Sequence, residues 1–254
     1  MKEVELNSIS ASKLRLYILC PRRYYYSYGE GVVQEETRAM LFGTYVHAVL
    51  ESYIKELLKS GLKQDLTALL RIASSNKEHF DAIEETGNLS FFEADILLNR
   101  FASQKIDPEK IYGVEKFFRI PLSENESVPI VGRIDRIDLE IGPDDEHLLH
   151  IIDYKTGRNE LTESELKKDI QMKFYVLASY YLYRRRYTRF RFTLYYLTDN
   201  SKVSVSTYFD HGFLKEINSY IDIIKNDTEF KKKPAQHCKN CPAFKDCRPE
   251  LEEK

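Results

Sequence analysis

The sequence has no strong excess of charge of either sign, because 38 lysines and arginines are balanced by 40 aspartates and glutamates. A uniformly basic nucleic-acid coat is therefore excluded, and any surface that binds a polyanion must be a local patch. No run of about 18 apolar residues occurs, so no membrane helix is expected. The start has no secretory apolar core, so we expect a cytoplasmic protein. With 43% hydrophobic residues, a disordered or fibrous chain is also excluded.

Cysteine is also scarce, with four in the chain, but three of them are clustered. Cys238, Cys241 and Cys247 form a C-x2-C-x5-C pattern, and Cys20 lies far upstream. Because cytosolic thiols are mostly reduced, a disulfide framework is a poor interpretation, and inert core cysteines would be scattered. Four thiolates suit zinc or an iron–sulfur cluster, and the spacing alone leaves both open. Either would join the two ends of the chain, so we expect a site that is structural first.

Periodicity and residue type predict helices at both ends of the chain and strands in its middle. The expected helices are a short one within 10–26 that stops near Pro21, then 41–60, 65–105 with a break at 86–90, 166–186 and 211–226. The expected strands are 112–121, 130–141, 148–154, 189–197 and 202–209, the last two as a hairpin that turns at 198–201. This order predicts an α/β or α+β fold with a mixed central sheet and a helical N-terminal cap.

Two of the expected strands carry charged residues among apolar ones. Asp153 and Lys155 share one strand face because side chains alternate. Buried charge is costly unless it is paired or metal-bound, so these two residues are either a satisfied ion pair or part of a site. If the two strands are neighbours, Asp135 converges with Asp153, and two close carboxylates favour a cation such as Mg²⁺ or Mn²⁺ between them. Asp138 is the runner-up for Asp135 but points to the opposite face.

Two helices supply further candidates for the same site. His47 lies on the apolar stripe of the second helix, where it is either a satisfied core histidine or a metal ligand. Glu51, one turn later, shares that face. Gln171 and Tyr175 are one turn apart on the helix that follows the Asp–Lys strand, and ordinary helix packing is the competing interpretation. A lysine beside a metal can orient and help deprotonate a water and stabilise charge on a phosphate.

Four motifs occur in the order seen in RecB-like nucleases of the PD-(D/E)XK superfamily. The chain resembles these nucleases from about residue 10 to residue 247, except in the helical stretch near 60–105. The motifs are GTYVHAVLE at 43–51, GRIDRID at 132–138, IIDYKTG at 151–157 and QMKFY at 171–175. The opening SASKLRLYILCPRRYYYSY is similar to the family's N-terminal motif. The late cysteines resemble those of members with a [4Fe–4S] cluster, which include CRISPR-associated nucleases and the AddB nuclease domain. The proline of the superfamily name is absent before Asp135, as RecB-like members commonly show.

This resemblance implies a role for each matching residue. The implied ligands of a catalytic Mg²⁺ or Mn²⁺ are His47, Asp135, Asp153 and the backbone carbonyl of Tyr154. The implied catalytic residues are Asp135, Asp153, Lys155, Gln171 and Tyr175, the last two near the DNA backbone. The implied ligands of the [4Fe–4S] cluster are Cys20, Cys238, Cys241 and Cys247.

The fold that the resemblance implies is α/β, a restriction-endonuclease-like core with a mixed central sheet, a helical N-terminal cap and a C-terminal iron–sulfur region. A single RecB-like domain would span 1–254, with 10–30 and 236–248 joined as an iron–sulfur subdomain and 107–227 as the catalytic core. The implied activity is that of a metal-dependent DNA exonuclease that hydrolyses phosphodiester bonds of single-stranded DNA or DNA ends. Its implied setting is CRISPR spacer acquisition or recombinational repair.

The chain has no P-loop motif G-x-x-x-x-G-K-[ST], which excludes a helicase motor of that type within it. We therefore expect DNA as substrate and a CRISPR integrase complex or a repair helicase as partner, with no membrane. The alternative is a catalytically weak DNA-end-binding assembly module with a structural four-cysteine metal site. The presence of His47, Asp135, Asp153 and Lys155 weakens this alternative, because a decayed site would have lost one of them.

Overall fold

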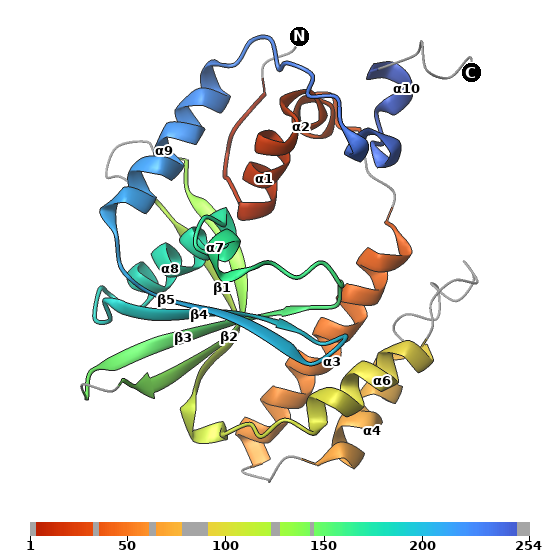
Figure 1. Cartoon of the computed structure of the whole chain (residues 1–254), viewed down its shortest axis with the longest axis vertical. Helices are drawn as coiled ribbons and strands as arrows, with labels where there is room; N and C mark the ends of the chain where they lie inside the picture. The colour runs from red at the N-terminus through yellow and green to blue at the C-terminus, as the bar shows by residue number, and fades with distance from the viewer. Residues whose placement is uncertain are drawn as a thin grey trace. The chain divides into compact units, whose positions relative to one another are not determined.

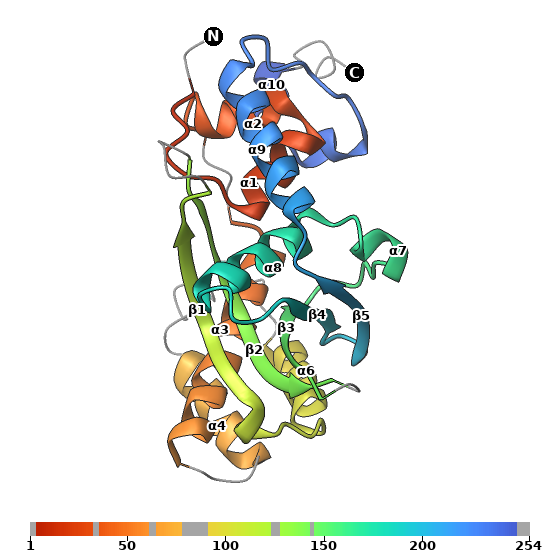
Figure 2. The same cartoon turned by 90° about the vertical axis from the view of Figure 1, so that its left-hand side faces the viewer.

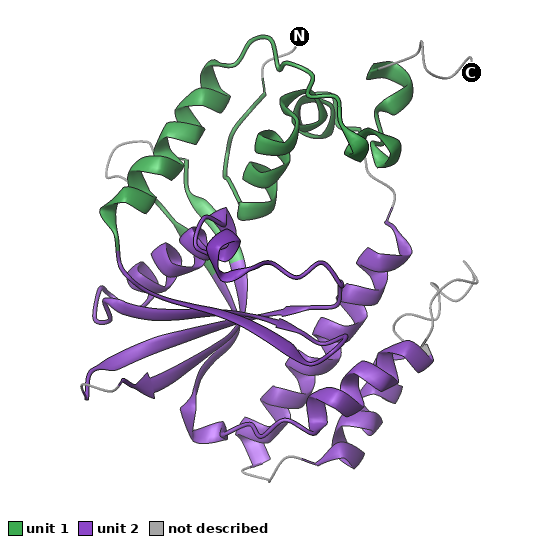
Figure 3. Ribbon diagram, viewed as in Figure 1, with its two compact units in different colours: residues 1–35, 118–132, 210–254 green, residues 36–117, 133–209 purple. Residues whose placement is uncertain are grey.

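The computed structural model describes residues 4–32, 36–60, 65–77, 91–122, 128–142 and 145–247. The chain divides into two compact units (Figure 3). One unit comprises Met1–Glu35, Phe118–Gly132 and Asp210–Lys254, and the other comprises Glu36–Phe117 and Arg133–Phe209. The expected boundaries of an iron–sulfur subdomain and a catalytic core stay predictions. Among the described helices, none combines the length and the apolar character that a membrane crossing requires.

A five-stranded sheet, with its strands in sequence order, is the centre of the larger unit (Figures 1 and 2). Its strands are β1 (Ile111–Ile120), β2 (Ile130–Ile141), β3 (His147–Lys155), β4 (Arg189–Tyr196) and β5 (Ser201–Tyr208). β2 runs antiparallel to β3, β3 parallel to β4, and β4 antiparallel to β5. The parallel pair needs a crossover connection, and the helix α8 (Ile170–Leu182) supplies it. The expectation of an α/β fold with a mixed sheet is confirmed.

Three helices of the larger unit form a core with one face of this sheet. They are α3 (Arg38–Ser60), α4 (Leu66–Lys77) and α6 (Phe91–Ala102). The apolar stripe of α3 is buried against side chains that β3 and β4 present, among them Tyr154 and Tyr195. Two short helices complete the unit, η2 (Pro108–Lys110) and α7 (Glu163–Leu166). The break expected at 86–90 lies outside the described residues.

The smaller unit brings together segments from both ends of the sequence. Its helices are α1 (Ala11–Leu19), α2 (Pro21–Tyr28), α9 (His211–Asn226), η3 (Gln236–Asn240) and α10 (Phe244–Cys247). The Tyr17 hydroxyl donates a 2.6 Å hydrogen bond to Asp227 Oδ2, and Arg22 Nε donates to the carbonyl of Phe230 at 2.9 Å. These buried and half-buried contacts hold the first two helices against the chain that follows α9.

Helix boundaries differ from expectation at two places. The first helix ends near Pro21 as expected, but a second helix begins at Pro21, with Cys20 extended between the two (φ −160°, ψ 106°). Proline fits there because the first helical N–H has no partner in any case. The expected helix 166–186 is shorter, since Asp169 caps α8 through the N–H groups of Gln171 and Met172. It ends where Arg184 and Arg185 adopt left-handed φ values of 54° and 62°.

Candidate metal-dependent active site

The two aspartates predicted to converge lie on neighbouring strands of the sheet. Ile137 of β2 pairs with Ile151 of β3, so the odd-numbered residues of both strands share one face. The backbone N–H of Tyr154 donates a 2.8 Å hydrogen bond to Asp135 Oδ2. Asp153 is 3% exposed and Asp135 is 9% exposed. Both carboxylates are therefore held at one end of the strand pair and largely withdrawn from water.

His47 reaches these carboxylates from α3. Its Nε2 lies 3.0 Å from the carbonyl oxygen of Tyr154, which can only accept, so this ring nitrogen is the donor. Its Nδ1 lies 3.5 Å from Asp135 Oδ2, so the imidazole and this carboxylate form an ion pair when the ring is protonated. Burial by itself lowers the pKa of His47, but the hydrogen bond and the charge of Asp135, with Asp153 and Glu115 adding to them, raise it to about 9.

Glu115 on β1 completes the cluster, and it was absent from the sequence-based candidates. Ligand atoms of His47, Glu115 and Asp135 all lie within 4.8 Å of one another, the one such set among the described residues. Burial, and then the negative charges of Asp135 and Glu51, raise the pKa of Glu115 to about 7. Glu115 also adopts a left-handed φ of 46°, a backbone conformation uncommon for any residue other than glycine. The available signal was a lone glutamate inside the otherwise strand-like YGVEKFFRI.

Lys155 and Gln171 surround the carboxylate of Asp153. Lys155 Nζ lies 2.6 Å from Asp153 Oδ2 and donates to Gln171 Oε1 at 3.2 Å. Gln171 Nε2 donates to Asp153 Oδ1 at 2.8 Å and lies 2.9 Å from the Tyr175 hydroxyl. Burial raises the pKa of Asp153, and the charge of Lys155 opposes that rise. The structure therefore brings all the predicted residues of this site together, with the amide of Gln171 joining the acid to the lysine.

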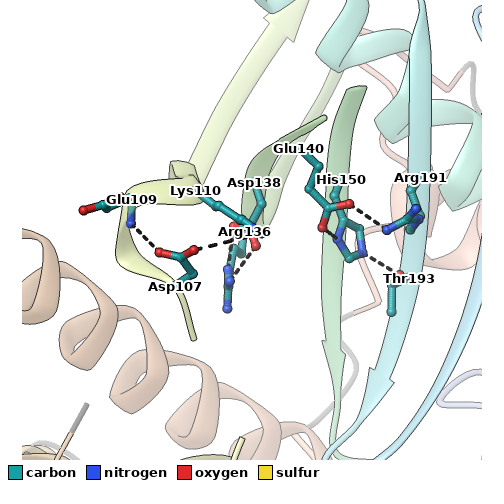
Figure 4. A network of polar contacts seen from close by, with 9 residues as sticks. All are labelled: Asp107, Glu109, Lys110, Arg136, Asp138, Glu140, His150, Arg191 and Thr193. Carbon is teal, nitrogen blue, oxygen red and sulfur yellow. Dashed lines mark hydrogen bonds and ion pairs between the residues drawn. The ribbon is translucent and has the colours of Figure 1, made fainter. Parts of the chain in front are cut away.

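Asp138 faces the other side of the sheet and takes no part in the cluster. Its carboxylate accepts from Arg136 Nε at 2.7 Å and Nη2 at 2.5 Å, in a pair that is almost fully buried. Figure 4 shows this pair beside a second polar group on the same face. In that group His150 lies 2.8 Å from Glu140 and 2.7 Å from Thr193. Asp138 is therefore a partner for a buried arginine, as its strand position predicts.

The four cysteines line one pocket in the smaller unit and form no disulfide. Arg23, Lys232 and Lys233 line the same pocket and provide positive charge beside the thiols. A single tetrahedral zinc ion holds its sulfur ligands about 3.8 Å apart. No three of these sulfurs lie within 4.8 Å of one another in the described residues. The four thiols are nevertheless gathered in one pocket, as a shared metal group requires.

Comparison with known proteins identifies the family of the chain. The PD-(D/E)XK nuclease superfamily matches residues 8–248, and the chain belongs to it. The chain is 23% identical over 193 residues to a subunit of the ATP-dependent helicase/deoxyribonuclease of Clostridium novyi (strain NT), across 65% of this chain and 17% of that protein. It is 27% identical over 198 residues to the subunit of the same name from Clostridium perfringens (strain SM101 / Type A), across 66% and 17%. The chain thus spans 17% of the length of each relative. The crystal structure of SSO0001 matches with a TM-score of 0.40 and 14% identity, over 94% of this chain and 84% of that one.

Replacing Asp138 tests its assignment to the scaffold. We predict that Asp138→Ala lowers the free energy of unfolding by about 3–5 kcal/mol, because it leaves the buried Arg136 without a counter-charge. Urea unfolding followed by circular dichroism measures this change. Asp222→Ala, at an exposed position on α9, is the matched control and should change stability by less than about 0.5 kcal/mol. Equal stability of the two variants would show that Arg136 does not depend on Asp138.

Proposed function

We propose that this chain is a metal-dependent DNA exonuclease domain that hydrolyses phosphodiester bonds of single-stranded DNA or DNA ends. The observation that carries the proposal is the convergence of His47, Glu115 and Asp135 within 4.8 Å, beside the Asp153–Lys155 pair. Superfamily membership supports nuclease chemistry. The relatives, which are subunits of a helicase/deoxyribonuclease, favour DNA repair with a helicase partner over the expected role in CRISPR spacer acquisition, which none of these names supports.

The donor set suits a hard divalent cation. An imidazole nitrogen and carboxylate oxygens are ligands that Mg²⁺ or Mn²⁺ accepts, and a cation would relieve the repulsion among buried acids. His47, Asp135 and Asp153 would hold the cation, as the resemblance implies. Glu115, which only the structure reveals, would be a further ligand. The carbonyl of Tyr154 already accepts from His47 and keeps a second lone pair for a cation. A divalent cation in such a site lowers the pKa of a water and neutralises charge that develops on the phosphate.

The remaining residues position the reacting groups. The Lys155 side chain is cationic and 31% exposed, whereas that of Asp153 is 4% exposed, so Lys155 can meet a phosphate and a water. Its ammonium orients the water and stabilises charge on the phosphate oxygens. Gln171 holds Lys155 through its amide oxygen and Asp153 through its amide nitrogen. Gln171 therefore fixes the distance between the acid and the lysine.

Variants of Asp135 and Lys155 separate cation binding from chemistry. We predict that Asp135→Asn removes Mn²⁺ binding measured by calorimetry, and with it cleavage of labelled single-stranded DNA. Lys155→Ala should keep Mn²⁺ binding but lower kcat by about 10²–10³-fold, because it removes one electrostatic contact to the transition state. Asp222→Asn serves as the control for both measurements. Wild-type cleavage by Asp135→Asn would refute the site, whereas strand binding without turnover in the wild type would favour the alternative assembly module.

We further propose that Cys20, Cys238, Cys241 and Cys247 hold a [4Fe–4S] cluster rather than zinc. The resemblance of the cysteine pattern to that of members with such a cluster supports the larger group, and the basic residues of the pocket would offset the negative charge of four thiolates. Because Cys20 precedes α2 and the other three follow α9, the cluster would join the two ends of the smaller unit. Its contribution would be to stability, through closure of a long loop.

Metal analysis tests the identity of this group. After anaerobic purification we expect a coloured protein with about four irons and four sulfides per chain, the composition of a cubane cluster. Cys238→Ser should lose iron and visible absorbance together and unfold at a lower temperature. Lys239→Ser, the neighbouring exposed substitution, should keep both. A colourless protein that contains one zinc per chain would contradict the cluster and indicate a structural zinc site instead.

A further inference from the structure

A groove of about 490 Å³ opens next to the candidate active site. It is formed by the start of α3, by α6 and by the chain that follows β3 and β4. Its lining includes Arg38, Phe42, Arg100, Thr156, Arg158 and Thr198. None of these residues belongs to the catalytic cluster, and all lie in the larger unit. A ligand of this groove would therefore be distinct from the cation of the catalytic cluster.

The groove continues from the catalytic cluster along two elements. On α3, the groove residue Phe42 lies just before Gly43, which is one helical turn before His47. On β3, the groove residue Thr156 directly follows Lys155. The Thr198 hydroxyl donates to the carbonyl of Thr156 at 3.1 Å, which fixes this corner. A polymeric ligand that contacts Lys155 would therefore reach the groove within one or two of its monomer units.

The positive charge of the groove favours a polyanionic ligand. Three arginines line it, and its one acidic residue, Glu93, is already paired with Arg38 at 2.7 Å. Arg100 and Arg158 are exposed, and their side chains have no ion pair with any residue in the described part of the chain. The first turn of α3 adds backbone N–H groups and the positive end of a helix dipole at the same place. Two uncompensated positive charges thus remain for a ligand.

The size and lining favour a single nucleic-acid strand over other polyanions. A volume of about 490 Å³ lies in the range of about 300–1,000 Å³ that holds one ligand of nucleotide size. Phe42 and Ile96 give the groove an apolar part between its arginines. Proteins that bind single strands combine cationic contacts to phosphates with apolar or aromatic contacts to bases. An acidic peptide would pair with the arginines, but it has no nucleobase that could contact the apolar part of the groove.

We propose that this groove binds the one or two nucleotides next to the scissile phosphate of a single DNA strand. Arg100 and Arg158 contact the phosphates, and Phe42 packs against a base. This assignment rests on the proposed nuclease function and adds to it, because it places the strand along α3 and α6. It predicts that strand affinity depends on residues that never touch the reacting phosphate.

The double variant Arg100→Ala/Arg158→Ala tests the groove by binding. We expect the Kd for a labelled 12-nucleotide single strand, measured by anisotropy in EDTA, to rise about tenfold or more. The slope of log K against log salt should fall by about 1.4, which is about 0.7 for each of two phosphate contacts. Lys59→Ala/Arg71→Ala, which removes two exposed charges from α3 and α4 outside the groove, should leave both quantities within about twofold of wild type.

A second measurement separates the groove from the chemistry. With Mn²⁺, the Arg100→Ala/Arg158→Ala variant should cleave the small diester bis(p-nitrophenyl) phosphate at the wild-type rate. Its kcat/KM for the oligonucleotide should fall about tenfold, mainly through KM. Unchanged strand affinity and unchanged kcat/KM in this variant would contradict the proposed binding of DNA in the groove. The proposal would also be contradicted if a polyglutamate peptide competed with the labelled strand as well as unlabelled single-stranded DNA does. If the wild type cleaves neither substrate yet strand binding still needs both arginines, the nuclease proposal fails and the groove stands.

Discussion

Mutual repulsion of buried carboxylates is the constraint on which this structure depends. Glu115, Asp135 and Asp153 come from three strands of one sheet, and burial, followed by the charges of Asp135 and Glu51, raises the pKa of Glu115 to about 7. His47, with its raised pKa, and Lys155 offset part of this charge, and Arg133 lies 3.6 Å from Glu115. Such an arrangement is unfavourable for a scaffold without a cation, since burial penalises each charged form. Under the proposed function a divalent cation would be the missing partner, and relief of this repulsion would add to the affinity for the metal.

The opposite face of the same sheet shows what a structural polar group looks like. There Arg136 and Asp138 satisfy each other bidentately, and Glu140 is shared by His150 and Arg191 (Figure 4). Charges of opposite sign are matched within hydrogen-bond distance, and the pKa of Glu140 is lowered, first by its hydrogen bond with His150. On the catalytic face the pKa values of Glu115 and Asp153 are raised instead. The pKa shifts of these three carboxylates therefore differ in direction between the two faces of the sheet.

Strand alternation explains how far the site could be predicted from the sequence. It placed Asp135 with Asp153 and Lys155, and excluded Asp138, because a period of two is fixed by backbone geometry. Glu115 was missed because its role depends on how β1 lies beside β2 and on a left-handed φ of 46°, and neither leaves a pattern in the sequence. The helix stop expected near Pro21 is confirmed, since α1 ends at Leu19. The second helix, which begins at Pro21, was not expected, because the same residue can stop one helix or start the next and the backbone of Cys20 decides.

The identity of residue 171 is determined both by where α8 begins and by the chemistry of the site. Asp169 caps α8 by accepting from the N–H groups of Gln171 and Met172, which sets where the helix begins. That position places the Gln171 amide between Asp153 and Lys155, with its donor end toward the acid and its acceptor end toward the ammonium. An amide is suited to this place because it satisfies both partners without adding charge to an already crowded site. A glutamate here would add a further buried carboxylate, and a lysine would compete with the cation, so the helix start and the site chemistry select the same side chain.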